Sequence, residues 1–171
     1  MLIRRETLAR IGGIDSIRTA LIDDCALSAR VKKSGGRVWL GTSEAPIRSL
    51  RDYPDASVIR RMIVRTAFAQ LDHSILLLLI TILGMLIVFI APVAVLFSGD
   101  RFAAALGAAT WMLSAALFVP VAREYRVPLL TSLCLPGIAL FYLAATVESA
   151  VRYRTGRGGE WKGRVQDTRQ G

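Results

Sequence analysis

The feature that most constrains this chain is the long apolar stretch from Ser74 to Ser149, in which charged side chains are confined to short breaks and one edge. Residues 74–99 contain no charged side chain. A hydrocarbon core of about 30 Å is crossed by about 20 helical residues. Segments 75–97, 102–122 and 127–147 have that length, and short charged turns separate them. The stretch therefore predicts an all-α anchor of about three transmembrane helices.

A soluble helical core is the alternative to a membrane anchor. A soluble helix shows a polar stripe every three to four residues, but residues 76–80 and 84–90 are apolar on every helical face. The composition agrees with a membrane protein, because 53% of the residues are hydrophobic and the mean hydropathy is +0.46. These observations favour the lipid bilayer as a partner.

The basic residues flank the apolar stretch on both sides. Residues 1–73 carry a net charge of +5 and residues 150–171 a net charge of +4, whereas residues 74–149 are neutral. Lys and Arg near the ends of membrane spans favour the cytoplasmic face and anionic lipid headgroups. The total charge of +9 is thus explained without nucleic acid, and we expect no nucleic-acid partner.

The first part of the chain has the pattern of a small α/β unit. A short helix is predicted over 4–11 and ends at a glycine pair, and a second begins near Ser16 or Thr19 and runs to Lys33. Residues 37–40 and 47–50 contain the β-branched and aromatic residues typical of short strands. The predicted fold is therefore an α/β fragment followed by the helical anchor.

Residues 56–73 connect these two parts. Their pattern is that of an amphipathic helix with an apolar patch and with arginines lying mostly away from it. A basic amphipathic helix that leads directly into a span is typical of an interfacial helix at headgroup level. Pro92 and Pro136, inside the first and third apolar segments, permit a break in those helices.

The carboxylate pair Asp23–Asp24 is the clearest candidate for chemistry. Adjacent residues on a helix point about 100° apart, so one carboxylate can face a cleft while the other is held by a neighbour. A carboxylate in a cleft can act as a general base toward a hydroxyl; a solvated helix face or a cap is the alternative. Cys25 and Cys134 have neither metal-binding nor disulfide spacing, and we expect reduced thiols and no metal site in this chain.

Three groups of residues carry a resemblance to a known family. The segments 11–13, 21–27 and 35–40 resemble the acceptor half of family 2 glycosyltransferases, which have the GT-A fold. Residues 65–71, the apolar stretch and the ending 156–166 look like the hopene-associated glycosyltransferases of bacterial hopanoid biosynthesis. The resemblance covers nearly the whole chain.

The resemblance implies roles for individual residues. It makes Asp24 the catalytic base of an inverting transfer, with Asp23 as the acidic residue before it. Arg65 matches the arginine of the family's Gln-x-x-Arg-Trp motif, although Met62 and Thr66 depart from it. Arg65 would lie near the diphosphate, or it would meet lipid phosphate at the end of an interfacial helix. The remaining candidates for substrate or phosphate binding are Gln70, Trp161 and Arg164. The two tail residues, Trp161 and Arg164, either fold back to the catalytic face or anchor the tail at the membrane interface.

The resemblance also implies what lies outside this chain. Family members place the nucleotide-sugar site and an Asp-x-Asp metal motif before the acceptor region, and no Asp-x-Asp occurs here. We expect a divalent metal, Mg or Mn, to belong to that donor half, and no sugar transfer by this chain alone. Residues 1–55 would be the C-terminal part of the catalytic domain, 56–73 the interfacial helix, 74–149 the anchor and 150–171 a basic tail.

The expected product is a multi-pass protein of the inner (cytoplasmic) membrane that moves a sugar from a nucleotide sugar to a lipid-like acceptor. The N-terminal part would be cytoplasmic. The side of the tail stays open, because three full spans would separate two basic flanks that both favour the cytoplasm. The alternatives are a non-catalytic membrane protein and a small transporter subunit; charged residues inside the spans, which a polar pathway requires, are limited to Glu148 at an edge.

Overall fold

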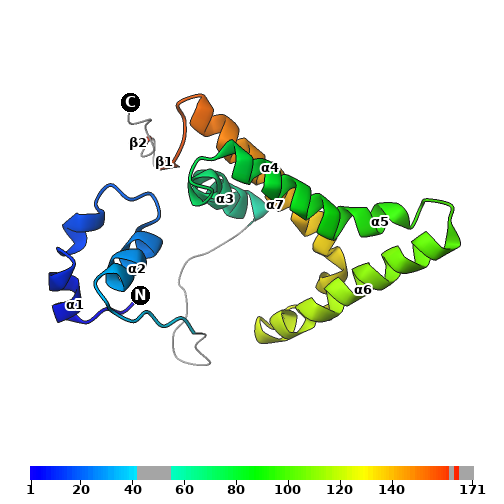
Figure 1. The fold of residues 1–171 in the computed structure, drawn as a ribbon, viewed down its shortest axis with the longest axis horizontal. Coiled ribbons are helices and arrows are strands. Elements are labelled where there is room, and N and C mark those ends of the chain that lie inside the picture. Colours follow the sequence, from blue (N-terminus) through cyan, green and yellow to red (C-terminus); the bar gives the residue numbers. More distant parts are fainter. Residues whose placement is uncertain (42–54, 162–163, 166–171) are drawn as a thin grey trace.

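The computed structural model describes residues 1–41, 55–161 and 164–165, and most of these residues are helical (Figure 1). The prediction of an α/β fragment is wrong. Residues 37–40, predicted as a strand, have no regular secondary structure, and Trp39 is 85% exposed. The second predicted strand, at 47–50, lies outside the described residues. The one strand pairing in the described part is short and lies in the tail.

The N-terminal unit consists of three short helical elements around a small apolar cluster. They are α1 (Arg5–Arg10), the 3-10 helix η1 (Ile14–Ile17) and α2 (Asp23–Lys33). Gly12 and Gly13 have φ values of 89° and 71°, which glycine adopts without the steric cost of a Cβ atom. The cluster is formed by four buried aliphatic side chains, Ile11, Ile17, Leu27 and Val31.

The second helix of this unit begins later than the sequence predicted. Residues near Ser16 belong to η1, and α2 starts only at Asp23. Carboxylates favour the first turn of a helix, where they meet the positive end of its dipole. The two acidic side chains therefore mark the start of α2 rather than its middle.

Among the described residues, three helices are long and apolar enough to cross a membrane, at the places where the apolar stretch predicted helices. The first comprises α4 (Ile75–Met85), the π-helical turn η2 (Leu86–Ile90) and α5 (Ala91–Val95). The second is α6 (Arg101–Glu124). The third comprises the 3-10 helix η3 (Leu129–Cys134) and α7 (Leu135–Arg154).

Both prolines singled out in the sequence lie where a helix changes its geometry. Pro92 follows η2, and Pro136 lies in the first turn of α7, directly after η3. Proline lacks the N–H that an internal helical position would donate, so it is tolerated in a first turn. The third apolar stretch is consequently a 3-10 segment followed by an α-helix.

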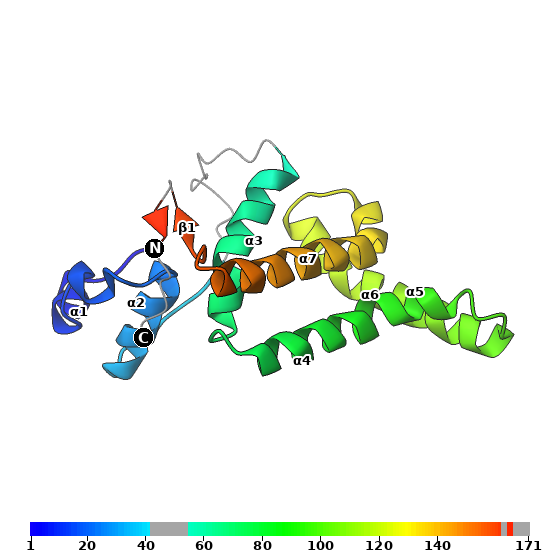
Figure 2. The same ribbon diagram turned by 90° about the horizontal axis from the view of Figure 1, so that it is seen from above.

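The amphipathic helix α3 (Ala56–Gln70) packs against α7 (Figure 2). Its buried residues Ile63 and Val64 meet Ala145, and Phe68 packs with Leu78 of α4 and Ala150 of α7. The apolar face of α3 is thus buried mainly against another helix. The interfacial position of α3 in a bilayer stays a prediction.

The helix α6 approaches α5 closely at a glycine. A Cβ atom on Gly107 would lie 2.5 Å from the carbonyl oxygen of Pro92, a distance at which something must shift. Small residues allow membrane helices to pack with their backbones this close. Further along, the indole Nε1–H of Trp111 donates to the carbonyl oxygen of Leu133 in η3, at 3.2 Å.

The tail after α7 turns back toward that helix. Gly158 and Gly159 are buried, and a Cβ atom on Gly158 would come within 3.1 Å of the Cα atom of Tyr153. Two strands, β1 (Glu160–Trp161) and β2 (Arg164–Val165), pair antiparallel beyond this contact. In Figures 1 and 2 the pair lies at the end of the bundle where the N-terminal unit also lies.

Candidate functional site

The carboxylates of Asp23 and Asp24 occupy the first turn of α2, and both residues are exposed. Oδ1 of Asp24 accepts a hydrogen bond from the backbone N–H of Cys25, at 2.8 Å. The first turn of a helix has N–H groups without intrahelical partners, and these stabilise a nearby anion. Asp24 is therefore a carboxylate held by the backbone and open to solvent.

The neighbouring thiol has a perturbed acidity. The pKa of Cys25 is raised, and the largest cause is desolvation of the thiol. The negative charge of Asp24, a hydrogen bond with Asp24 and the negative charge of Asp23 raise this pKa further. The thiolate is the reactive form of cysteine. The raised pKa therefore favours the protonated thiol of Cys25 at neutral pH.

The second group of candidates lies on α3. Asp55 caps this helix, because its Oδ1 accepts from the backbone N–H groups of Ser57 at 2.7 Å and Val58 at 3.3 Å. A hydrogen bond with the Ser57 side chain, followed by these backbone bonds, holds the pKa of Asp55 below its usual value. Arg65 lies half-buried in the second half of α3, and Gln70 is its exposed last residue.

The structure places the candidate residues on three separate elements. Asp23 and Asp24 belong to the N-terminal unit, Arg65 and Gln70 to α3, and Trp161 and Arg164 to the paired strands of the tail. The apolar cluster of the N-terminal unit, to which α2 contributes Leu27 and Val31, does not include residues of α3 or α7. The described residues thus do not assemble these candidates into one packed site.

No group of three His, Cys, Asp or Glu side chains that could hold a metal ion is found among residues 1–41, 55–161 and 164–165. The exposed Asp23–Asp24 pair supplies only two carboxylate side chains. The described part therefore offers no cage of protein ligands for a metal ion.

Two sets of interactions between α3 and α7 were missed from the sequence. The first is a charged cluster in which Glu148 of α7 accepts from Arg60 of α3 and from Arg152, whose Nε lies 3.0 Å from Oε1 of Glu148. A charge at the edge of an apolar span is costly unless it is paired. The lone carboxylate in the third apolar stretch was therefore the signal that a basic partner would lie nearby.

The second is an aromatic cluster at the end of α7. The rings of His73 and Tyr153 stack with centroids 4.0 Å apart, and Phe68 meets each of them edge-on at 5.5 Å. His73 has a φ of 53°, an uncommon value outside glycine. The half-buried ring of His73 thus packs against other aromatic rings of the protein.

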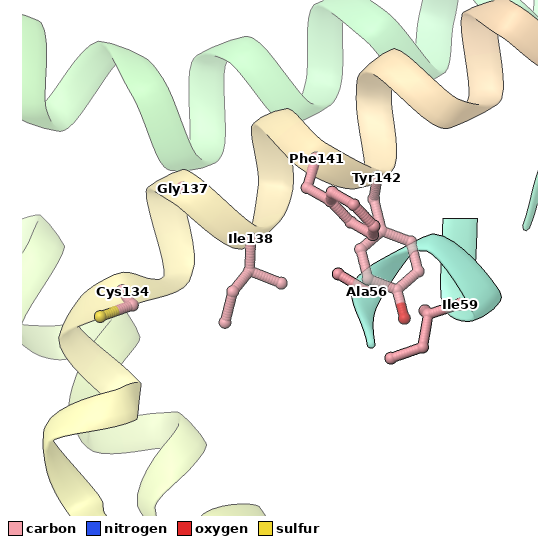
Figure 3. Close-up of a pocket in the computed structure, with 7 residues that line it drawn as sticks. All are labelled: Ala56, Ile59, Cys134, Gly137, Ile138, Phe141 and Tyr142. Atoms are coloured by element: carbon pink, nitrogen blue, oxygen red, sulfur yellow. The ribbon is translucent and has the colours of Figure 1, made fainter. Parts of the chain in front are cut away.

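An open pocket lies between α3 and the first half of α7 (Figure 3). Its volume is about 400 Å³. The lining is mostly apolar, with the hydroxyl of Tyr142 at the end that faces α3 (Figure 3). Such a lining suits a hydrocarbon group better than a charged one. The lining residues are Ala56, Ile59, Cys134, Gly137, Ile138, Phe141 and Tyr142.

Comparisons with known proteins gave one match. The family model described as Glycosyl transferase family 21 matches residues 1–163. Neither the comparison with curated proteins nor the comparison with solved structures gave a match. The family match covers the N-terminal unit, α3, the three apolar helices and the first strand of the tail.

Proposed function

The chain belongs to glycosyltransferase family 21, and from this premise we propose that it forms part of a membrane-bound enzyme that transfers a sugar from a nucleotide donor to a lipid-like acceptor. Membership confirms the prediction of a glycosyltransferase. The finer assignment to family 2 and its hopene-associated subgroup is not supported, because the matching family is family 21. A role in hopanoid biosynthesis rests on the sequence resemblance alone, and the proposal does not depend on it.

The observation that carries the proposal is the exposed carboxylate of Asp24 at the start of α2. In the proposed reaction this carboxylate takes the proton of an acceptor hydroxyl. The hydroxyl oxygen forms a bond to the anomeric carbon as the bond between that carbon and the diphosphate oxygen breaks. The nucleoside diphosphate leaves with the electron pair, and the configuration at the anomeric carbon is inverted.

Arg65 is proposed to stabilise the charge that develops on the diphosphate. A guanidinium group binds phosphate oxygens with paired donors, which makes it suited to this role. Asp23 would support Asp24 from the adjacent position, and Gln70, Trp161 and Arg164 are proposed as further substrate contacts. The reaction requires α2 and α3 to approach a common substrate.

The pocket between α3 and α7 is proposed to hold the hydrocarbon part of the acceptor. Its lining is apolar, and it lies beside a helix that is long and apolar enough to cross a membrane. Gly137 offers a direct test, because a Cβ atom there would meet no atom within 4 Å. Gly137→Leu would fill the pocket and raise the KM for the lipid acceptor while leaving the KM for the nucleotide sugar unchanged. An unchanged acceptor KM would refute this assignment of the pocket.

The experiment that tests the function is a transfer assay on membranes that contain the complete gene product with these residues. Radiolabelled nucleotide sugars would be supplied, and label in the lipid extract would be counted. We expect labelled lipid with the unmodified protein and none above background with Asp24→Asn. Asp15→Asn, which removes another exposed carboxylate of the N-terminal unit, is the matched control and should keep activity. Equal labelling by both variants would refute the role of Asp24.

A further inference from the structure

The start of the first apolar helix and the end of the third lie together in the structure. Leu78, in the first turn of α4, belongs to the same buried cluster as Ala150, near the end of α7. The ring of His73, just before α4, stacks on Tyr153 of α7 at 4.0 Å. Phe68 of α3 belongs to the same cluster, and Figures 1 and 2 show α3, α4 and α7 meeting at this end. We call the place where the start of α4 meets the end of α7 the near end of the bundle.

The opposite ends of these helices also lie together. The turn η2, in the second half of the first span, packs against α7. Close to it, Gly107 of α6 meets Pro92 of α5, and Trp111 of α6 binds Leu133, just before α7 begins. The start of α5, the first half of α6 and the start of α7 therefore gather at one place, which we call the far end.

From this arrangement we propose that the chain before α4 and the chain after α7 lie on the same face of the bilayer. The first span leads from the near end to the far end, and α7 leads back. The 21 residues of the first span extend about 32 Å, which matches a hydrocarbon core of about 30 Å. The segment between them, α6 with η3, leaves from the far end and returns to it as a hairpin.

The charge distribution supports this topology independently of the packing. Both flanks are basic, with net charges of +5 over residues 1–73 and +4 over residues 150–171. Basic flanks favour the same, cytoplasmic, face. Three full spans would place the two basic flanks on opposite faces of the membrane. The return of the chain through η3 places both flanks on the same face.

Part of the return segment is covered by protein and has a protein partner for its backbone. Non-helical backbone at membrane depth is tolerated where protein covers it or satisfies its polar groups. The 3-10 segment η3 packs along α6, and the carbonyl oxygen of Leu133 accepts the indole N–H of Trp111 at 3.2 Å. Ser132 is 2% exposed, so this part of η3 faces protein.

The test places single cysteines on the proposed faces. In a background with Cys25→Ser and Cys134→Ser, the added variants are Thr19→Cys before α4, Ser98→Cys between α5 and α6, and Thr155→Cys after α7. All three positions are exposed. A membrane-impermeant maleimide would be applied to intact spheroplasts and to inside-out vesicles of the expression host.

The thiols at positions 19 and 155 should react from the same side, and the thiol at position 98 from the opposite side. Reaction of positions 98 and 155 from one side, with position 19 on the other, would overturn the proposal. Reaction of all three from one side would also overturn it, because the first span would then not cross. The labelling needs no enzymatic activity, so its outcome is independent of the proposed function.

Discussion

Phe68 is the side chain on which the junction of α3, α4 and α7 most depends. It is 2% exposed and packs with Leu78 and Ala150. Its ring also meets His73 and Tyr153 edge-on, with centroids 5.5 Å away in both cases. We expect Phe68→Ala to separate α3 from the two membrane helices and to lower the stability of the folded chain.

The magnitude follows from the lost packing. Truncation of a buried Phe to Ala costs about 3–5 kcal/mol in the free energy of unfolding. Phe68→Leu keeps most of the apolar volume but loses two aromatic pairs, each of which contributes about 0.5–1.5 kcal/mol, so we expect a loss of about 1–3 kcal/mol. Phe102→Ala on α6 is the matched control, because this side chain is 81% exposed, and its effect should stay within about 0.5 kcal/mol.

The assay is unfolding of the purified protein in mixed detergent and SDS micelles, followed by tryptophan fluorescence. Phe68→Ala should unfold at a clearly lower SDS fraction than the unmodified protein, with Phe68→Leu between them. If Phe68→Ala and Phe102→Ala unfolded at the same SDS fraction, the packing of α3 on the membrane helices would be refuted.

Three further predictions use the same protein. Gly107→Ala should lower the free energy of unfolding by about 1–3 kcal/mol, because its Cβ atom would lie 2.5 Å from a backbone carbonyl oxygen of α5. Gly84→Ala is the control and should not destabilise the protein, because a Cβ atom there has open space around it. Equal losses for the two variants in SDS unfolding would contradict this. Glu148→Gln should destabilise by about 1 kcal/mol, since it weakens two partly exposed ion pairs, and the loss should shrink at high salt; a loss independent of salt would point away from ion pairing. Asp24→Asn should lower the raised pKa of Cys25, so that iodoacetamide modifies this thiol faster at pH 8; an unchanged rate would show that the carboxylate does not control the thiol.

The sequence predicts the membrane part well because hydropathy is a local property. A segment such as 75–97 is apolar on every face, and no distant partner is needed to make it a helix in lipid. Proline likewise acts locally, so the change of geometry at Pro92 and Pro136 followed from sequence.

The strand predicted at 37–40 failed for the opposite reason. Val38 and Trp39 have side chains that are frequent in strands, but β-propensity expresses packing against neighbouring strands. The described residues offer this segment no such neighbour, and Trp39 stays exposed. A strand preference without a sheet does not produce a strand.

The candidate site could be predicted only residue by residue. The sequence singled out Asp24 and Arg65, and their roles remain predictions. It did not identify the pairing of Glu148 with Arg60 of α3, because the two residues lie 88 positions apart and only the fold brings them together. Long-range ion pairs of this kind cannot be read from spacing.

The proposed role of Asp24 as the general base of a glycosyl transfer is tested by a measurement that separates donor binding from the chemical step. The complete enzyme and its Asp24→Asn variant would be compared by nucleotide-sugar binding in calorimetry and by kcat at saturating acceptor. We expect unchanged donor binding and a kcat lower by about 10²–10⁴-fold, the usual contribution of a general base. A variant that bound the donor and kept the kcat of the unmodified enzyme would contradict the claim.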